Sequence, residues 1–370
     1  MAIFAGLDVH SKQCTYVIQD AAGKVLAKGE FATTLVGIAD WVKRHSLDKE
    51  STIGMETGLT TPFVARTLNA CGLEHVKIIN AVEVRAKARR KTQKSDSGDA
   101  FEICDGIRRD IYTSIVELPD AQTQKLRDLL ATRRHFVTAA TREVNGIKSA
   151  LRKAGLGQLY RSLSSDKAFA KLLAQPQLDE ALKANIEAHQ RLWTAARNEV
   201  KTLETQLEEL QSVMADAVER LRTVPGVGPI VALTALAFFS RPARFQNAKH
   251  AASYTGLVPQ MYNSADRECY GHITKQGPNE LRAMLCEAAQ HAAKKGHPLH
   301  LHYAKIRNKK GHKVAAIAIA HRLARILWAM LRKETTFDSA RYALLNPKWL
   351  QVMQDDTTTT ADTDAHVVTH

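Results

Sequence analysis

Closely spaced cysteines are missing from this sequence. Its 5 Cys residues are an odd number, are scattered along 370 residues and form no CxxC pair. This pattern excludes a disulfide framework, and it argues against a zinc site built from Cys ligands. The cysteines therefore predict a protein of the reducing cytoplasm.

Long apolar segments and acidic residues are also scarce. No uninterrupted apolar run reaches roughly 18 residues, and no charged-then-apolar signal segment opens the chain, so we expect no membrane partner. Asp and Glu number 38 against 52 Lys and Arg, which gives a net charge of +14 and a pI near 9.6. A surface this basic attracts polyanions, and nucleic acid is the commonest of them. An anionic membrane is the weaker alternative.

Residues 1–117 alternate strand and helix patterns. Short apolar runs bounded by turn residues predict strands at 2–10, 14–20, 25–33, 51–56 and 75–80. Apolar residues at helical spacing predict helices at 34–46 and 62–72, and another helix follows the fifth strand. This order predicts an α/β domain in which helices pack on a mixed sheet.

Residues 118–222 have an almost purely helical pattern. From residue 186 to residue 221, mostly apolar side chains recur at alternating spacings of three and four, and neither Gly nor Pro interrupts them. A strict repeat of this kind predicts a coiled coil, whereas one long helix packed on its own core is the alternative. The partner of this helix is either the helix at 121–155 or a second chain.

Residues 223–345 are predicted to form a second, mostly helical domain. It opens with Pro225-Gly226-Val227-Gly228, which has the form of a helix-hairpin-helix turn. In such a turn, backbone N–H groups of the glycines at a helix N-terminus bind a phosphate without reading sequence. A plain Gly-rich connection between helices is the alternative. Residues 346–370 are rich in Thr and Asp and predict a disordered tail.

Four carboxylates fall at the ends of predicted elements in the first domain. Asp8 ends the first strand, Glu56 ends the fourth, and Asp96 and Asp99 begin the helix after the fifth. Strand ends bring distant residues together, and acids three apart share a helical face. Converging carboxylates repel one another unless a cation is bound, and oxygen ligands suit Mg²⁺ or Mn²⁺. Two such ions about 3.5–4 Å apart can hold the attacking and leaving oxygens of a phosphodiester.

Each of these acids taken alone has an ordinary structural explanation. Asp8 can cap a turn, Glu56 can be a surface acid, and Asp96 can be the N-cap of the helix that follows. Glu102 and Asp105 lie further along that helix and are the alternative ligands. The four acids considered together favour a metal site, because all of them end a strand or begin a helix in one fold.

Three stretches that contain these acids, GLDVHSK, METG and KSDSGDA, resemble the motifs of the DEDD transposases. The N-terminal domain of these insertion-sequence recombinases is like the Holliday-junction resolvase RuvC. The resemblance implies an RNase H-like fold for residues 1 to about 115. It also implies that Asp8, Glu56, Asp96 and Asp99 are the D, E, D and D, which hold the catalytic metal ions.

A basic run precedes the last two acids. It consists of Arg85, Lys87, Arg89, Arg90, Lys91 and Lys94, with one acid, Glu83, just upstream. Cations beside a metal site are predicted to hold phosphates of the strand being processed, with an affinity that depends on salt. A solvated helix face is the alternative.

Residues 245–285 resemble the C-terminal domain of the same transposases, through the elements GL-P-x-x-Y-x-S and G-x-I-T-K-x-G-x-x-x-L-R. The match places Ser264 at the position of the proposed nucleophile, which would form a phosphoserine link to DNA. Ala265 follows it, where relatives often have glycine. Without the resemblance, a serine in YNSAD would be interpreted as a turn residue.

Further cations and histidines follow this serine. Lys275 and Arg282 are candidate phosphate contacts, with ordinary surface charge as the alternative. The segment HPLHLH, residues 297–302, lacks Cys or acidic partners at fixed spacing, so contact with a nucleic-acid backbone is preferred over metal binding.

The leading functional hypothesis is a transposase or site-specific recombinase that cuts and rejoins DNA. The resemblance implies guidance by a structured bridge RNA and action as a homodimer or homotetramer. One alternative is a junction-resolving or other metal-dependent nuclease that uses water. A nucleic-acid-binding protein with an inactive tetrad is the third hypothesis.

Overall fold

The computed structural model describes residues 2–88, 95–159, 162–264 and 267–339, and only the backbone within residues 262–270. The chain divides into two compact units, Met1–Pro119 and Asp120–His370, which we call unit 1 and unit 2. Each is described by itself.

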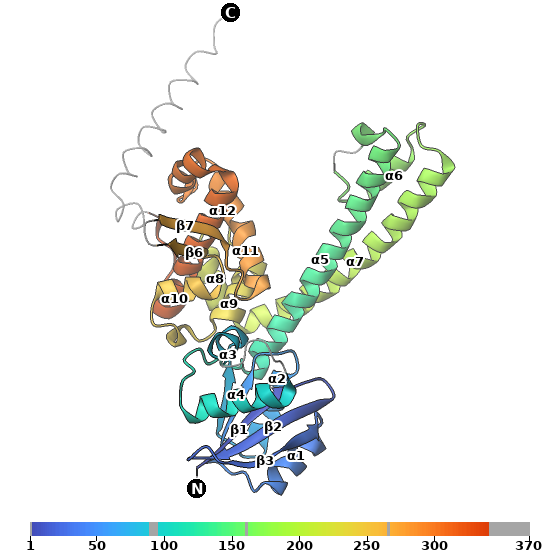
Figure 1. Cartoon of the computed structure of the whole chain (residues 1–370). Helices are drawn as coiled ribbons and strands as arrows, with labels where there is room; N and C mark the ends of the chain where they lie inside the picture. Colours follow the sequence, from blue (N-terminus) through green and yellow to red (C-terminus); the bar gives the residue numbers. More distant parts are fainter. Residues whose placement is uncertain (1, 89–94, 160–161, 265–266, 340–370) are drawn as a thin grey trace, which may run out of the picture. The chain divides into compact units, whose positions relative to one another are not determined.

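Unit 1 is built on a five-stranded mixed sheet (Figure 1). The strands are β1 (Ile3–Val9), β2 (Gln13–Asp20), β3 (Val25–Ala32), β4 (Thr52–Glu56) and β5 (His75–Ile79), and their order across the sheet is β3-β2-β1-β4-β5. β1, β4 and β5 are parallel, whereas β2 runs antiparallel to both β1 and β3. The predicted mixed sheet with flanking helices is confirmed, and its strands begin and end within two residues of the predicted positions.

Helices cover both faces of this sheet. α1 (Leu35–Arg44) and α2 (Thr61–Ala70) share a core with Ala5 and Leu7 of β1. α4 (Asp96–Arg108) packs on the opposite face against β1, β2 and β4, and the short α3 (Ala81–Lys87) precedes it. The alternation of β1 explains this division, because neighbouring strand residues point to opposite faces.

Two glycines let α4 approach the sheet closely. A Cβ added at Gly6 would lie 2.2 Å from the carbonyl oxygen of Ala100 in α4, and one added at Gly54 would lie 2.7 Å from a methyl carbon of Ile107. Both glycines lie on central strands at paired positions of β1 and β4. The spacing between α4 and the sheet, and therefore the position of the acids at the start of α4, depends on these missing side chains.

Replacing Gly6 by alanine should therefore lower the free energy of unfolding by about 2 kcal/mol or more, because the backbone of α4 must move away. Urea denaturation followed by circular dichroism measures this change. Gly157→Ala is the matched control, since its added Cβ would meet nothing closer than Cγ of Arg152 at 3.4 Å. Equal stability of Gly6→Ala and wild type would show that α4 does not depend on this contact.

Unit 2 begins with two long helices, α5 (Ala121–Lys153) and α7 (Glu180–Val213), which lie side by side (Figure 1). The buried side chains of α7 all belong to the predicted seam; they are Ile186, Trp193, Ala196, Val200, Leu203 and Leu207. α6 (Asp166–Leu173) covers one end of the pair, where the rings of Phe169 and Trp193 pack at a tilt with centroids 4.9 Å apart. The part of the predicted seam on α7 packs against α5, whereas its last part lies on α8 (Ala215–Arg222), which packs on α9 (Pro229–Phe239) and α12 (His300–Lys333).

The larger core of unit 2 joins the other end of this pair to the remaining helices. These are α8 (Ala215–Arg222), α9 (Pro229–Phe239), α10 (Ala248–Tyr254), α11 (Asn279–Ala289) and α12 (His300–Lys333), with 3-10 turns at Pro242–Arg244 and Gln290–Ala293. An antiparallel hairpin, β6 (Pro259–Ser264) and β7 (Arg267–Ile273), lies between α10 and α11. The sequence patterns did not predict this hairpin.

Among the described residues, one helix, α12, is long and apolar enough to cross a membrane. Half of its apolar window is buried inside the protein. Ile319, Leu323 and Leu327 are at most 1% exposed in the core of unit 2. Packing in this core accounts for the apolar composition of the helix.

Candidate active site

Asp8 lies near the carboxyl end of the central strand β1. It follows Gly6 by two residues and therefore projects from the face that α4 covers. The residue is buried, with 7% of its surface exposed. A carboxylate this buried needs a cation or hydrogen-bond donors nearby.

Glu56 ends β4, the parallel neighbour of β1. Leu7 pairs with Met55, so Asp8 and Glu56 follow at adjacent positions of the same sheet edge. Both project from the α4 face, because Gly6 pairs with Gly54 two residues earlier. The sheet therefore places these two acids on neighbouring strands, as predicted from strand ends.

Asp96 and Asp99 lie in the first turn of α4. The N-cap of this helix is Ser95, whose side chain accepts a hydrogen bond from the backbone N–H of Gly98 at 3.2 Å. The interpretation of Asp96 as the N-cap is therefore wrong. Both acids face the positive end of the helix dipole, which favours their charged form.

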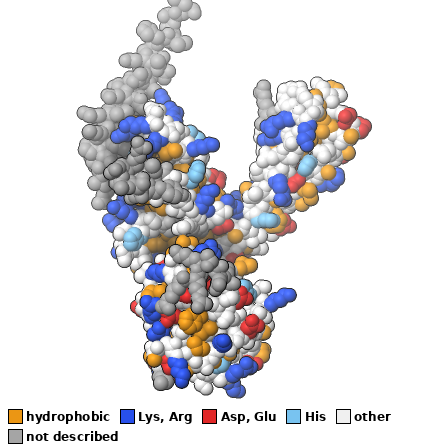
Figure 2. Space-filling model, in the orientation of Figure 1, with side chains coloured by type: hydrophobic (Ala, Val, Ile, Leu, Met, Phe, Trp, Pro, Cys, Tyr) orange, Lys and Arg blue, Asp and Glu red, His pale blue; other side chains and the backbone are white. Residues whose placement is uncertain are grey.

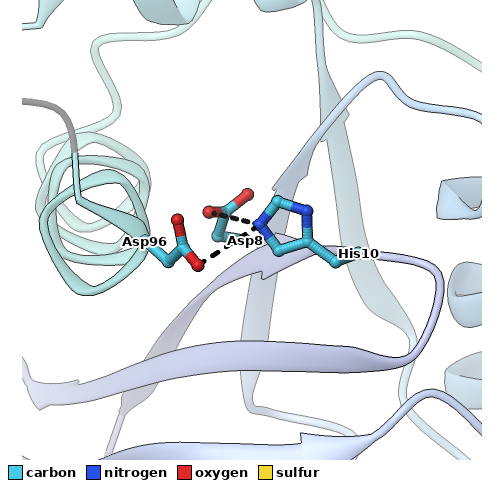
Figure 3. A group of neighbouring side chains, drawn as sticks. All are labelled: Asp8, His10 and Asp96. Atoms are coloured by element: carbon cyan, nitrogen blue, oxygen red, sulfur yellow. Dashed lines mark hydrogen bonds and ion pairs between the residues drawn. The ribbon is translucent and has the colours of Figure 1, made fainter.

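The side chains of Asp8, His10 and Asp96 converge on one point (Figure 3). Nε2 of His10 lies 3.2 Å from Oδ2 of Asp8 and 3.6 Å from Oδ2 of Asp96. One ligand atom from each residue lies within 4.8 Å of the others, which is a spacing suited to a metal ion. Sequence reasoning did not select His10, although its position two residues after Asp8 puts it on the same side of the strand.

Electrostatic repulsion marks this cluster. Burial raises the pKa of Asp8 above its ordinary value, the nearby charge of His10 lowers it, and the charges of Asp96 and Asp99 raise it further. Asp99 therefore lies close enough to act on Asp8, although the three-residue group does not include it. A divalent cation would relieve this repulsion, and three carboxylates with one imidazole fit Mn²⁺ as well as Mg²⁺.

Glu56 and the alternative ligand Asp105 have other neighbours than the cluster of Asp8, His10 and Asp96. The Glu56 carboxylate is close enough to Tyr112 to contribute to its raised pKa, for which burial and Glu102 are the larger causes. Asp105 is buried, and Arg108 contacts one of its oxygens at 2.5 Å while Arg109 contacts the other at 3.4 Å. These ion pairs give Asp105 a structural role within α4, and they make it a poor metal ligand.

Ser264 is the last residue of β6, where its backbone pairs with Arg267 of β7. It therefore directly precedes the tip of an antiparallel hairpin. The base of this hairpin is hydrogen bonded, because the N–H of Thr274 donates to the carbonyl of Val258 at 2.8 Å. The backbone of Ser264 therefore ends a strand whose hairpin is anchored at its base.

Arg282 fastens the loops below this hairpin. Its guanidinium donates to the carbonyls of Thr255, Lys275 and Gly277, each at 3.3 Å. The two loops cross closely, because a Cβ added at Gly277 would lie 2.1 Å from the carbonyl oxygen of Tyr254. The sequence elements GL-P and TKQG therefore lie next to each other because their two loops pack together. Lys275 itself adopts a left-handed backbone, with φ of 55°, at this crossing.

The turn Pro225–Gly228 joins α8 to α9. Gly226 has φ of 83°, and a Cβ there would lie 2.8 Å from Cβ of His291, so this glycine meets a conformational and a packing need. Gly228 is the N-cap of α9, and a Cβ built on it meets nothing within 4 Å. Nε2 of His297 contacts the carbonyl of Pro225 at 3.0 Å and holds the turn in place.

The histidines of HPLHLH bind the backbone. Nδ1 of His297 accepts from the N–H of Leu299 at 3.0 Å while its Nε2 donates to Pro225, which requires the neutral ring. Burial lowers the pKa of His297, in agreement with a neutral ring. Nδ1 of His300 contacts the carbonyl of Ala292 at 3.1 Å. The preference against a metal site here agrees with these contacts.

Comparison with known proteins gives two family matches. Residues 5–155 match the DEDD transposase model of the IS110 group, described as a transposase, and residues 218–304 match the model described as the transposase IS116/IS110/IS902 family. The two matches cover the carboxylate cluster and the serine hairpin. The chain belongs to the DEDD-type transposases.

Relatives of this transposase carry corresponding names. The transposase for insertion sequence element IS1328 of Yersinia enterocolitica is 26% identical over 300 residues, which are 77% of this chain and 85% of the relative. The transposase for element IS1111A of Coxiella burnetii is 26% identical over 67% of this chain and 69% of its own. The pilin gene-inverting protein of Moraxella lacunata is 32% identical over shorter shares, 32% and 38%.

Two of the predicted phosphate-binding cations of this transposase lie on α3. Arg85 is exposed, whereas Nζ of Lys87 contacts the Glu83 carboxylate at 2.5 Å and also donates to the carbonyl of Ile111. The other four, Arg89, Arg90, Lys91 and Lys94, lie outside the described residues.

Glu83 anchors the helix that leads into the basic run. The N–H groups of Thr113 and Ser114 donate to its carboxylate at 3.0 and 2.7 Å, in addition to the contact with Lys87. Burial alone would raise its pKa, but these donors lower it from 4.5 to about 2.

Glu83→Gln should lower the free energy of unfolding at pH 7 by about 2 kcal/mol, because charge-assisted hydrogen bonds are lost. Since the folded state depresses this pKa, the contribution is complete above pH 4.5 and disappears as the pH falls towards 2. Denaturant unfolding at pH 7 and pH 3 should therefore show a smaller difference at pH 3. Glu50→Gln, at an exposed position, is the control. If wild type and Glu83→Gln differ in unfolding free energy by the same amount at both pH values, the charged carboxylate of Glu83 is not the source of the stability.

Proposed function

We propose that this transposase cuts and rejoins DNA by attack of Ser264 on a phosphodiester, assisted by metal ions bound to Asp8, Glu56, Asp96 and Asp99. One observation carries the proposal: oxygen atoms of the buried Asp8 and the exposed Asp96 converge, and the charges of Asp96 and Asp99 both raise the pKa of Asp8. The names of the relatives, transposases and a pilin gene-inverting protein, support DNA as the substrate.

The carboxylates have the role of holding Mg²⁺ or Mn²⁺. Asp8 and Glu56 enter from adjacent strand ends, and Asp96 and Asp99 enter from the first turn of α4. The bound ions supply charge that stabilises a phosphate under attack. His10 supplies a nitrogen ligand beside them, since its Nε2 lies 3.2 Å from Oδ2 of Asp8 and 3.6 Å from Oδ2 of Asp96.

Ser264 supplies the attacking atom. Its Oγ forms a bond to phosphorus, and the bond between phosphorus and one deoxyribose oxygen breaks. The serine proton passes to water, and the departing oxygen takes up a proton to become a hydroxyl. The phosphoserine link preserves the bond energy, so that attack by a new deoxyribose hydroxyl rejoins the strand and releases the serine.

The remaining partners follow from the family. We propose action in the cytoplasm as a homodimer or homotetramer on donor and target DNA, guided by a bridge RNA. Arg85, the cations at 89–94 and Lys275 contact phosphates, and the turn at Gly226 and Gly228 offers backbone N–H groups to another phosphate. Lys87 and Arg282 act mainly through the contacts that they make inside their own units.

The proposal is tested by looking for a covalent protein–DNA adduct. The protein is incubated with Mg²⁺, DNA carrying the ends of its own element, and RNA transcribed from the flanking DNA, and protein-bound DNA is detected after denaturation. An adduct that requires the metal supports the proposal. Cutting without an adduct would identify a nuclease that uses water, and binding with neither cutting nor adduct would identify an inactive nucleic-acid-binding protein.

A further inference from the structure

One long stretch of unit 2 contains basic residues but no acidic ones. No Asp or Glu occurs between Glu287 and Glu334. The charged residues in that stretch are Lys294, Lys295, Lys305, Arg307, Lys309, Lys310, Lys313, Arg322, Arg325, Arg332 and Lys333. A solvated helix face normally mixes both signs of charge, so this distribution calls for a negatively charged partner.

The structure gathers five of these cations at a kink in α12. Gly311 has φ of 81° and ψ of 168°, so that two helical segments meet there. Lys305, Arg307, Lys309, Lys310 and Lys313 surround the kink, and all five are exposed. We call these five residues the basic apex. Figure 2 shows Lys and Arg side chains gathered over this end of α12.

The basic apex is held on a fixed support. Tyr303, which is 3% exposed, contacts Nδ1 of His312 through its hydroxyl at 2.7 Å and so ties the two sides of the kink together. Ile306 packs against the core of unit 2 between the outward cations. Because the supporting backbone is already ordered, binding a partner here costs little conformational entropy.

The side chains at the apex favour a duplex. Residues 305–314 contain no Phe, Tyr or Trp, and the one aromatic ring among them, His312, contacts the Tyr303 hydroxyl, so the stretch is poor in platforms on which unpaired bases stack. A lipid surface fits less well, because Val314 is the one large apolar side chain exposed beside these cations, whereas Ala315 and Ile319 are buried in the core. Clustered lysines without aromatic residues suit the phosphates of a double helix.

We infer that the basic apex is a second DNA-binding site, which holds the phosphate backbone of duplex DNA without reading its sequence. The inference rests on the proposed function only in taking DNA as the partner. It concerns a surface of unit 2 that takes no part in the chemistry at the carboxylates or at Ser264.

The test measures binding without catalysis. A fluorescein-labelled 30-base-pair DNA duplex of mixed sequence is titrated with the full chain in EDTA at several NaCl concentrations. In the apex variant, Lys305, Lys309, Lys310 and Lys313 are changed to Gln. We expect the slope of log K against log salt to decrease in magnitude by about 3 to 4, and affinity at 0.15 M salt to fall on the order of 100-fold.

Two matched variants control for charge and folding. Changing the exposed Lys24, Lys28, Lys43 and Lys49 of unit 1 to Gln removes the same number of charges and should alter the slope by less than about 1. Changing the four apex lysines to Arg keeps the charge and should keep the wild-type slope. Circular dichroism melting verifies that each variant is folded.

Three results would overturn the inference. They are an unchanged slope in the apex variant, an equal decrease in the unit 1 control, and a decrease confined to an RNA duplex or to anionic phospholipid vesicles. The adduct assay is separate from this measurement. If Ser264 proves not to be the nucleophile, the measured DNA affinity of the basic apex still stands. If the basic apex proves not to bind DNA, the measured protein–DNA adduct still stands.

Discussion

Ser264→Ala is expected to abolish the covalent protein–DNA adduct and to lower strand transfer by more than about 1,000-fold, because no other atom replaces the nucleophile. DNA binding should remain within about threefold of wild type. Ser264 is the last residue of β6, and alanine can take up the same backbone position without changing the strand. Adduct formation is measured by denaturing electrophoresis of labelled DNA, and binding is measured by anisotropy.

Ser253→Ala is the matched control for this prediction. Ser253 is an exposed serine in α10, and its backbone carbonyl accepts the N–H of Gly256 whether or not the hydroxyl is present. The control should form the adduct at the wild-type rate. An adduct that persists in Ser264→Ala would show that another residue attacks the phosphate, and the role of the hairpin would then be structural.

Asp8→Asn is expected to lower DNA cutting by more than about 1,000-fold while raising the stability of the metal-free protein. Activity falls because the central ligand of the cluster loses its charge. Stability rises because Asp8 is buried and repelled by Asp96 and Asp99, which together raise its pKa. Removing a charge from such a site should raise the free energy of unfolding by about 1 kcal/mol.

The pH dependence gives this prediction a second readout. Because the folded state raises the pKa of Asp8, the metal-free wild type becomes less stable as the pH rises through that pKa, and Asp8→Asn should not show this loss. Added Mg²⁺ or Mn²⁺ should raise the melting temperature of wild type by binding the folded state, but not that of the variant.

Asp110→Asn provides the control for the carboxylate prediction. Its side chain is 82% exposed and forms an ion pair with Nζ of Lys77 at 3.1 Å. Cutting and the metal-dependent melting temperature should both stay at their wild-type values. If Asp8→Asn retains the metal response, the cation binds elsewhere and the tetrad assignment fails.

Short-range patterns were sufficient to place much of the site. Asp8 and Glu56 were predicted at strand ends; Glu56 is the last residue of β4 and Asp8 the last but one of β1, because apolar runs bounded by turn residues define strands locally. The pair Asp96 and Asp99 was placed at a helix start on the same grounds. The identity of the N-cap was mistaken, because Asp and Ser are nearly equivalent caps and only the backbone geometry distinguishes them.

Residues that act through distant contacts could not be found in this way. His10 joins the cluster because α4 carries Asp96 to within 3.6 Å of it, across 86 positions of the chain. Arg282 was predicted as a phosphate contact, with ordinary surface charge as the alternative, and its guanidinium reaches the carbonyls of two crossing loops. A helix period or a charge pattern contains no information about which carbonyl lies opposite a side chain.

The sequence by itself determined the charge of this transposase, the order of strands and helices in unit 1, and the positions of its four candidate carboxylates, because these depend on side-chain chemistry and local spacing. Only the tertiary structure decided that α4 rests on Gly6 and Gly54 and that Asp8 and His10 meet Asp96. Packing between elements far apart in the chain sets these distances, and no local preference specifies it.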